Sequence, residues 1–562
     1  MSNIDWIVLC FTLLAIIGFG LYKSKSSKNL EGYFLSNKSM PWYLVLLSIM
    51  GTQASAITFL SAPGQAFTDG MRFVQYYFGL PIAMVVLCIT FVPLFNKLKV
   101  YTAYEFLEQR FDNKVRSFTS ILFLLSRGLS TGISIYAPSI ILSSLLGWNI
   151  FYTNIVMGGL LIIYTVSGGA RAVAYTQTLQ FIIIFCGMFA AGYYIIHLLP
   201  ENIGFVDALK ISGANNKLNV ITTGFTKNGF DFKDKYNIIS GIIGGFFLAL
   251  SYFGTDQSQV GRYLTAKDNT ESKLGLLMNG IVKVPMQFFI LLIGALLFVF
   301  YQFKPMPIYF DKGVEEKVYQ SAYKDSMQQV QNAYNTVQLQ KQDASIDYVK
   351  TNNANLKLQI QYLKTKEDSL RQLASHYTVA SKASVDGKDT NYIFLRFVVD
   401  NLPKGLVGLL IAIIFLSAWG SIAAALNSLA SSTTIDFHLR FTKQNNTDKQ
   451  QYNLSKLYTL AWGIFCIVVA QLATGIGSLI EAVNVLGSLF YGVILGIFLV
   501  AFYCKKVQAN AVFTAAVIGE IFVITIFILD KLNIIGLGFL WLNVIGALMV
   551  VALSVLLQRM KI

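Results

Sequence analysis

Two basic side chains stand inside long apolar runs of the sequence, where a charge needs a partner or a ligand. Arg127 lies within the run from Leu124 to Thr131, and Lys283 lies two residues before Pro285. A charge inside a bilayer is costly unless it is paired or hydrated, so such residues mark functional sites. Arg127 is therefore a candidate for binding an anionic substrate, with internal pairing or snorkelling as the alternative. For Lys283 we favour a structural role.

Glycine and proline interrupt the apolar run that surrounds residue 55. The segment Gly51-Thr-Gln-Ala-Ser-Ala-Ile-Thr58 is followed by Ser61 to Gly64, with Pro63 between them. A break releases backbone carbonyls that lipid cannot satisfy, so it must face protein or a water-filled cavity. Carbonyls at such breaks coordinate the coupling cation in many transporters. The segment predicts either a cation site or a simple packing kink.

A second polar stripe lies in a later apolar run. Ser417 and Ser421 are four residues apart, so they share one helix face. Small residues on a helix face also allow two helices to approach closely. Close packing is the ordinary explanation of such a stripe, and a role in function is the alternative.

The elements that must position these residues are membrane-spanning helices. Of the 562 residues, 55% are hydrophobic and 13% are charged, against about 25% charged in soluble proteins. So few charges cannot cover several water-facing domains, whereas the apolar runs fit the ~20 residues of a transmembrane helix. We expect an all-α integral membrane protein with thirteen spans, at about residues 3–22, 43–66, 73–94, 116–144, 151–167, 173–199, 236–260, 275–302, 405–437, 453–474, 479–503, 508–529 and 536–558.

The distribution of charge sets the expected orientation. The net charge is +15, from 44 Lys and Arg against 29 Asp and Glu. Basic residues accumulate on cytoplasmic loops, and the loops after odd-numbered spans hold residues such as Lys97, Arg110, Arg262 and Lys505. This pattern places the N-terminus outside and the C-terminus in the cytoplasm, in a multi-pass protein of the inner cell membrane. It also accounts for the positive charge without a nucleic-acid partner.

Residues 303–390 break the apolar pattern. They contain twelve basic and ten acidic residues, and apolar side chains recur at roughly helical spacing on both sides of 343–355. This favours an antiparallel helical hairpin, which the topology places outside the membrane. A passive insertion that caps the protein is the simpler role, and a docking surface for another envelope protein is the alternative.

The sequence contains no residue pattern that is typical of an enzyme active site. The five cysteines have no CxxC or metal-ligand spacing, and the three histidines are far apart. We find no nucleophile motif and no phosphate-binding loop. We therefore expect a protein that is not an enzyme and has no cofactor other than a coupling ion.

Three motifs resemble those of the sodium/solute symporter family. The run Ser167-Gly-Gly-Ala-Arg-Ala-Val-Ala-Tyr-Thr176 is similar to the family's GG-x-x-A-V-x-W-T signature. Gly254-Thr-Asp-Gln257 with Arg262-Tyr-Leu-Thr-Ala-Lys267 resembles a second motif, and Ala425-Leu-Asn427-Ser428 resembles a third. The resemblance implies the LeuT-like architecture of two inverted five-helix repeats with discontinuous helices, here spans two to six and seven to eleven.

The resemblance also implies an ion site. In that family the main sodium site uses carbonyls of the broken helix and oxygens of the eighth core helix, which here correspond to Gly51, Ala54, Ser417 and Ser421. The family usually has two adjacent hydroxyl residues where this chain has Gly420 and Ser421. One oxygen ligand is therefore missing, and the choice between Na⁺ and H⁺ as the coupling ion stays open.

A second cation site, which some members of the family have, is not expected here. Those members carry an aspartate where this chain has Gln177, and serines where it has Ala423 and Ala424. A neutral amide cannot supply the charge that a carboxylate gives to a bound cation. We therefore predict one coupling ion per transport cycle.

By the same resemblance, the substrate chamber lies between the broken helix and spans three, four and seven. Arg127 matches the position where sialic-acid members hold the substrate carboxylate, as a guanidinium can do with two hydrogen bonds. Residues 130–138 and 56–60 instead resemble the iodide, monocarboxylate and multivitamin branch, and both resemblances favour an anion. The implied substrate-binding residues are Ser55, Thr58, Phe73, Gln75 and Arg127.

These expectations define a function and six parts of the chain. We predict Na⁺-coupled symport of a small organic anion by alternating access, with the solute, Na⁺ and the lipid bilayer as partners. A sugar or polyol symporter, or a sensor that keeps the carrier fold, is the alternative.

The parts of the chain are a peripheral first helix with its loop (1–42), the first repeat (43–199), an exported loop with two helices of the second repeat (200–302), the hairpin insertion (303–390), the rest of the second repeat (391–503) and two peripheral helices (504–562).

Overall fold

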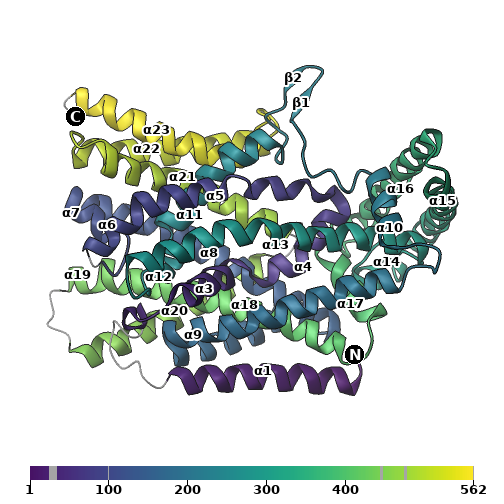
Figure 1. Ribbon diagram of the computed structural model, residues 1–562, viewed down its shortest axis with the longest axis horizontal. Coiled ribbons are helices and arrows are strands. Elements are labelled where there is room, and N and C mark those ends of the chain that lie inside the picture. Colours follow the sequence, from purple (N-terminus) through teal and green to yellow (C-terminus); the bar gives the residue numbers. More distant parts are fainter. Residues whose placement is uncertain (25–34, 99, 443–446, 474–476, 561–562) are drawn as a thin grey trace.

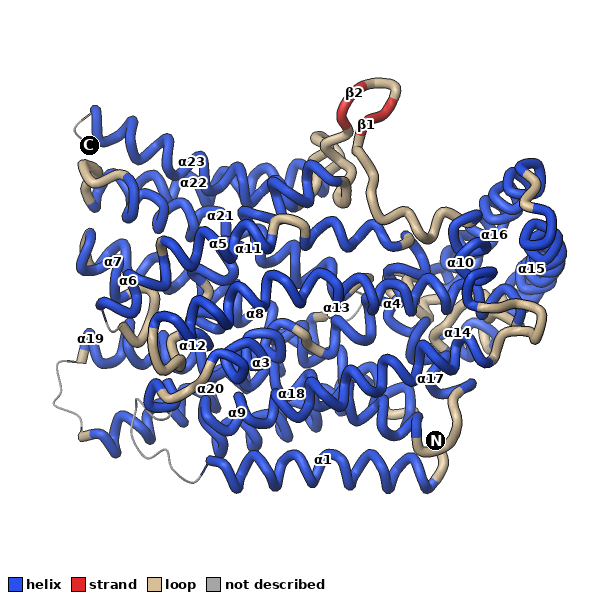
Figure 2. Tube along the Cα trace, viewed as in Figure 1, coloured by secondary structure: helices blue, strands red, loops and turns tan. Residues whose placement is uncertain are grey.

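The long apolar runs fold into a bundle of helices whose axes lie roughly along one direction (Figure 1, Figure 2). The computed structural model describes residues 1–24, 35–98, 100–442, 447–473 and 477–560. The side chains of residues 167–172, which include the first half of the glycine-rich family motif, also lie outside this description.

The elements of the first half of the chain are α1 (Asn3–Ser24), η1 (Ser36–Lys38), α3 (Trp42–Gln53), α4 (Ala56–Asp69), η2 (Met71–Tyr77), α5 (Leu80–Ile89), α6 (Phe91–Leu98), α7 (Glu105–Arg110), α8 (Asn113–Leu146), α9 (Ile150–His197), α10 (Phe205–Ala214), β1 (Phe225–Thr226), β2 (Gly229–Phe230), η3 (Ser240–Gly244), α11 (Gly245–Thr255), α12 (Gln257–Tyr263) and α13 (Asn269–Phe303). The elements of the second half are α14 (Lys312–Tyr319), α15 (Lys324–Thr351), α16 (Ala354–Ala380), η4 (Thr390–Tyr392), α17 (Ile393–Asn401), α18 (Leu406–Ser432), η5 (Thr433–His438), α19 (Leu439–Phe441), α20 (Asp448–Leu472), α21 (Leu479–Tyr503), α22 (Ala509–Lys531) and α23 (Leu540–Arg559). The two short strands β1 and β2 pair antiparallel.

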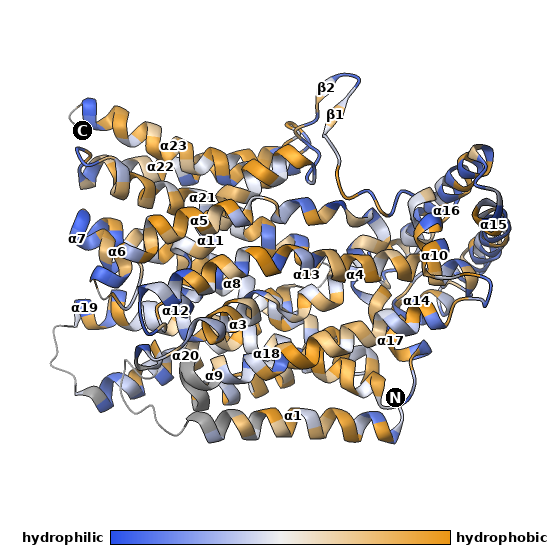
Figure 3. Cartoon of the chain, viewed as in Figure 1, coloured by the Kyte–Doolittle hydropathy of each residue, from blue (hydrophilic) through white to orange (hydrophobic). Residues whose placement is uncertain are grey.

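The helices divide into full-length spans and shorter apolar helices. Within the described residues, nine helices are long and apolar enough to cross a bilayer, and the bent pair α3–α4 makes a tenth. Shorter apolar helices lie at Asn3–Ile16, Ile150–Val166 and Ser240–Thr255, where the sequence predicts the three remaining spans. The protein is thus a multi-pass, mostly helical membrane protein, coloured as apolar over most of the bundle in Figure 3.

Two helices are broken in the middle of the bundle. α3 and α4 meet at an angle of 61°, because Ala54 (ψ 76°) and Ser55 (ψ 173°) leave the helical conformation. α11 and α12 are separated by the single extended residue Asp256 (φ −77°, ψ 116°). The predicted discontinuous helices are therefore present, and each break frees backbone groups away from the bundle ends.

The 48-residue element α9 contains two of the predicted spans. The hydroxyl groups of Tyr164 and Thr176 lie 2.8 Å apart, although twelve residues of straight helix rise about 18 Å. The two halves therefore fold back on each other between these residues, in agreement with the predicted spans 151–167 and 173–199.

Helices α15 and α16 lie side by side at one end of the bundle and are polar over most of their surface (Figure 1, Figure 3). They are joined to the bundle by buried polar contacts: Gln338 donates to the carbonyl of Lys304 at 2.9 Å, and Ser345 donates to Gln302 at 3.1 Å. The N-terminus lies at the same end as these helices, and the C-terminus lies at the opposite end (Figure 1).

An ion pair between Lys341 of α15 and Glu367 of α16 is buried, since these residues are 1% and 3% exposed. We expect Glu367→Gln to lower the free energy of unfolding by about 3 to 5 kcal/mol, because it leaves the Lys341 ammonium buried without its counter-ion. Asp368→Asn is the matched control on the same helix, because it removes only a pair between more exposed side chains, Lys364 and Asp368. Thermal unfolding in detergent checks this, and equal melting temperatures for the two variants would contradict it.

Candidate functional site

A cavity lies beside the break between α3 and α4. It has a volume of about 110 Å³ and is walled by that break, η2, α8, α11 and α21. A smaller cavity of about 60 Å³ lies between the same break, α8 and α18. The residues that line both cavities are Gln53, Ser55, Arg127, Tyr252 and Val483.

Three of the five residues predicted to bind substrate line the larger cavity. Ser55 and Thr58 stand at the start of α4, and Arg127 enters from the middle of α8. The cavity wall also includes the aromatic side chains of Tyr76 and Tyr252. The structure therefore brings Ser55, Thr58 and Arg127 together around one small space with polar and aromatic walls, which suits a small polar ligand.

The other two predicted residues lie outside the cavity wall. Phe73 is buried, with its ring stacked on that of Tyr76 at 5.5 Å and edge-on to Tyr236 at 5.0 Å. The Gln75 amide donates to the hydroxyl of Thr222 and to the carbonyl of Tyr236, both at 3.0 Å. In this structure both residues anchor the loop that follows α10.

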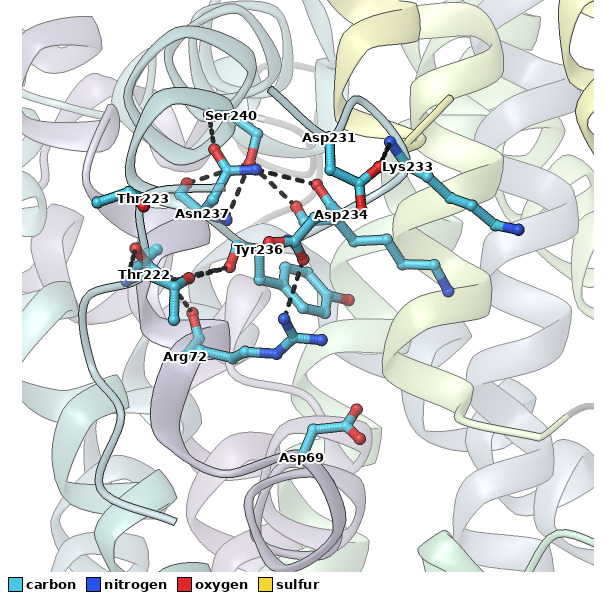
Figure 4. A network of polar contacts seen from close by, with 12 residues as sticks. Asp69, Arg72, Thr222, Thr223, Asp231, Lys233, Asp234, Tyr236, Asn237 and Ser240 are labelled. Atoms are coloured by element: carbon cyan, nitrogen blue, oxygen red, sulfur yellow. Dashed lines mark hydrogen bonds and ion pairs between the residues drawn. The ribbon is translucent and has the colours of Figure 1, made fainter. Parts of the chain in front are cut away.

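Figure 4 shows the polar network of that loop. Arg72 pairs with Asp234 at 2.9 Å, and the hydroxyl of Thr222 donates to the carbonyl of Tyr236 at 2.9 Å. Asn237 and Ser240 close the turn before α11 with a hydrogen bond of 2.9 Å. The network connects η2 to the residues just before α11, the helix that ends at the break at Asp256.

Arg127 is 8% exposed and incompletely paired. One terminal nitrogen of its guanidinium lies 3.9 Å from a carboxylate oxygen of Asp256, which is an ion pair without a hydrogen bond. The guanidinium carbon lies 5.8 Å from the centre of the Tyr252 ring, and Nε has no hydrogen-bond partner among the described residues. The guanidinium is thus held in place by Asp256 and Tyr252, while its Nε–H has no acceptor among the described residues.

Asp256 is a charged residue beside this site to which our sequence reasoning gave no role, although it lies in a quoted motif. It lies at the break between α11 and α12 and is 1% exposed. One carboxylate oxygen accepts from the backbone and the hydroxyl of Ser258, at 2.7 and 2.6 Å, and the other accepts from the Tyr491 hydroxyl at 2.7 Å. The sequence did contain a signal for Asp256. It is a charged residue at the end of an apolar run, and by the argument used for Arg127 such a charge marks a functional site.

Lys283 lies near this site but is not part of its wall. It is fully buried in α13, with its ammonium 5.4 Å from the centre of the Tyr77 ring. Nζ has no hydrogen-bond partner among the described residues. The contact with an aromatic face is a favourable one for a cation, which agrees with the structural role we favour.

The four residues of the predicted ion site lie on two neighbouring helices. Gly51 and Ala54 are at the end of α3, and Ser417 and Ser421 are in α18, which contacts α3. The two serine hydroxyls donate to backbone carbonyls of their own helix, at 2.8 and 3.1 Å. Their oxygen lone pairs are left free to accept, and Ser421 borders the smaller cavity. This set of hydroxyl and backbone oxygens fits a small hard cation.

Gln177 of α9 fills the space beside this pair of helices. Its amide nitrogen donates to the Gly420 carbonyl at 3.1 Å and to the Thr52 hydroxyl at 3.3 Å, and its amide oxygen accepts from Ser48 at 3.0 Å. A Cβ atom on Gly51 would come within 2.9 Å of the Gln177 side chain. Where some relatives are expected to hold a second cation, this chain therefore has a neutral amide that bridges α3 and α18.

Two broken helices around a buried, charged cavity in a multi-pass membrane protein define the class of secondary transporters. The model of the sodium:solute symporter family matches residues 33–330 and 372–519. The chain belongs to this family, and the intervening residues 331–371 lie in α15 and α16.

Two relatives match nearly the whole chain, and a third matches about half of it. The sodium/sialic acid symporter NanT of Aliivibrio fischeri is 24% identical, and the match covers 100% of this chain and 94% of the relative. The sodium/sialic acid symporter SiaT of Proteus mirabilis is 26% identical over 98% of this chain and 93% of its own length. The human sodium/iodide cotransporter is 27% identical over 53% of this chain. A solved structure of a Na⁺-coupled sialic acid symporter has the same fold, with a TM-score of 0.75 at 23% identity, over 100% of this chain and 98% of that chain.

Proposed function

We propose that this protein is a Na⁺-coupled symporter of a small organic anion of the sialic acid type. The observation that carries the proposal is Arg127, a buried guanidinium in the wall of a small cavity whose Nε has no hydrogen-bond partner among the described residues. A carboxylate is the group that a guanidinium fork binds best. The relatives that span the whole chain, which are named as sodium/sialic acid symporters, support the same class of substrate.

The proposed topology has thirteen spans in the inner membrane, with the N-terminus outside and the C-terminus in the cytoplasm. Nine full-length spans, the bent pair α3–α4 and three shorter apolar helices among the described residues support that number. Spans two to six and seven to eleven would form the inverted repeats, each of which begins with a broken helix. Helices α15 and α16 would form an extracytoplasmic insertion, since they are polar and the family model does not match 331–371.

The proposed coupling follows from the position of the ion site. A cation held by Gly51, Ala54, Ser417 and Ser421 would fix the end of α3 against α18, and with it the start of α4. Ser55 and Thr58, which line the substrate cavity, stand at that start. Ion and substrate would then each favour the same arrangement of the broken helix, so that each tightens the binding of the other.

Uptake into proteoliposomes tests the proposal. We expect uptake of radiolabelled sialic acid to rise at least about tenfold when an inward Na⁺ gradient replaces a K⁺ gradient, because bound Na⁺ tightens the binding of the acid and its gradient drives the acid inward. The methyl ester of the same acid is the matched control, because it keeps the sugar and lacks the charge. Equal uptake in Na⁺ and K⁺ would contradict sodium coupling, and equal uptake of acid and ester would favour the sugar or polyol alternative.

A further inference from the structure

The positive charge of Arg127 is paired inside the protein with the carboxylate of Asp256. The hydrogen bonds of that carboxylate are satisfied without Arg127. Asp256 already accepts three hydrogen bonds of 2.6 to 2.7 Å, two from Ser258 and one from Tyr491. Its contact with Arg127 is longer, at 3.9 Å. A carboxylate with three close donors stays satisfied when a fourth partner moves away. Arg127, in contrast, has no acceptor for its Nε–H among the described residues.

We infer that Asp256 is the counter-ion of Arg127 in the empty carrier, and that Arg127 exchanges it for the carboxylate of the incoming substrate. The inference rests on the proposed function, because it needs an anionic substrate. Asp256 acts through Arg127 and is a positioning residue. Without substrate it keeps the buried guanidinium neutralised, and with substrate bound it releases the guanidinium without losing its own hydrogen bonds.

The position of Asp256 links this exchange to the second broken helix. Its carboxylate caps the N-terminus of α12 through Ser258, and its other oxygen reaches α21 through Tyr491. Arg127 belongs to α8 and Ser55 to the first break. The empty carrier therefore has an ionic link between α8 and the α11–α12 break, and substrate binding replaces it with a link between α8 and the ligand at the α3–α4 break.

The exchange of partners at Arg127 predicts which step of the transport cycle depends on Asp256. After the substrate is released inside, the empty carrier must change back from the inward-open to the outward-open state with Arg127 buried. A buried charge without a counter-ion is unfavourable in a low dielectric, so the return step needs Asp256. Exchange of external for internal substrate does not include that step, because the carrier is loaded in both directions.

Asp256→Asn tests the inference in the full-length protein, since asparagine keeps the shape of the side chain and its ability to cap a helix. In proteoliposomes with radiolabelled sialic acid, we expect net uptake into empty vesicles to fall at least about tenfold. Exchange into vesicles preloaded with the unlabelled acid should stay within about threefold of the wild type. The equilibrium Kd of the acid should fall by about tenfold, because Arg127 no longer interacts with a competing anion.

Asp268→Asn is the matched control. Asp268 caps the N-terminus of α13 through the backbone of Glu271 at 3.0 Å, so the variant removes the same charge from a helix cap that has no ion pair with Arg127. It should lower net uptake and exchange by the same small factor. A loss of both activities to the same extent in Asp256→Asn, or no loss of net uptake, would overturn the inference.

A second measurement separates pairing from folding. If Asp256 and Arg127 neutralise each other, Asp256→Asn and Arg127→Gln should each lower the melting temperature, and the double variant should lose less than the sum of the two. Additive losses would overturn the pairing whatever the protein transports. Failure of the wild type to bind any carboxylate would overturn the proposed function, and would leave the double-variant result as the test of the pair.

Discussion

Arg127→Gln is expected to weaken the binding of a carboxylate substrate about 100-fold, the largest effect of any single substitution in the cavity wall. The guanidinium can give the carboxylate two charge-assisted hydrogen bonds, each worth about 1.5 to 3 kcal/mol, in a site from which water is largely excluded. Glutamine can give one neutral hydrogen bond from a shorter side chain. Isothermal titration calorimetry in detergent measures the change in Kd. Each factor of ten in Kd corresponds to about 1.4 kcal/mol of binding free energy.

Two further variants make this result specific. Arg127→Lys keeps the charge but loses the two-pronged geometry, so we expect an intermediate loss of about tenfold. Arg72→Gln removes an arginine that pairs with Asp234 outside the cavity wall, and it should leave the Kd within about threefold. Unchanged binding of the acid by Arg127→Gln would refute a role for this residue in recognising the carboxylate.

The features that the sequence predicts correctly are those that depend on neighbours along the chain. The sequence indicates a break within residues 51–64, and the structure places it at Ala54 and Ser55, with Pro63 and Gly64 inside α4. Among the described residues, nine predicted spans are full-length helices and the bent pair α3–α4 makes a tenth, because apolar runs of about 20 residues are long enough to cross a bilayer. The importance of a charge inside such a run follows from the bilayer alone, which is why Arg127 could be singled out. Its place in the cavity wall agrees with that reasoning.

The features that could not be predicted depend on contacts between distant segments. Arg127 and Asp256 are 129 positions apart, and only the fold places them 3.9 Å from each other. Gln75 was assigned to the substrate by resemblance to the family, whereas its amide donates to Thr222 and Tyr236 of a loop far along the chain. Such pairs obey no local spacing rule, so a single sequence contains no signal for them.

Gln177 shows how a prediction from sequence can leave out what a residue does. The absence of a carboxylate at this position led us to expect one coupling ion, because a neutral amide cannot supply the charge that a carboxylate gives to a bound cation. The structure adds what the amide does instead: it donates to the Gly420 carbonyl of α18 and accepts from Ser48 of α3. The two helices that a cation would draw together are here joined by neutral hydrogen bonds.

Gln177→Glu is therefore expected to change the dependence of transport on Na⁺. The substitution places a carboxylate oxygen where the amide nitrogen now lies 3.1 Å from the Gly420 carbonyl, so two acceptors face each other in a site that is 1% exposed. Such a pair is strongly unfavourable unless a proton or a cation lies between the two oxygens. We expect uptake at low Na⁺ to fall at least about tenfold and to recover at high Na⁺, with a Hill coefficient that rises from about 1 toward 2, because a second ion becomes necessary.

The matched control is Gln177→Leu, which removes the same hydrogen bonds without adding a charge. It leaves the Gly420 carbonyl and the Ser48 hydroxyl without this partner, so it should lower the free energy of unfolding by about 1 to 3 kcal/mol, while the Hill coefficient stays near 1. A sodium dependence of Gln177→Glu that matches that of Gln177→Leu would refute the idea that the amide replaces an ion. If the two differ as expected, a single amide in place of a carboxylate determines how many cations this carrier needs to hold α3 against α18.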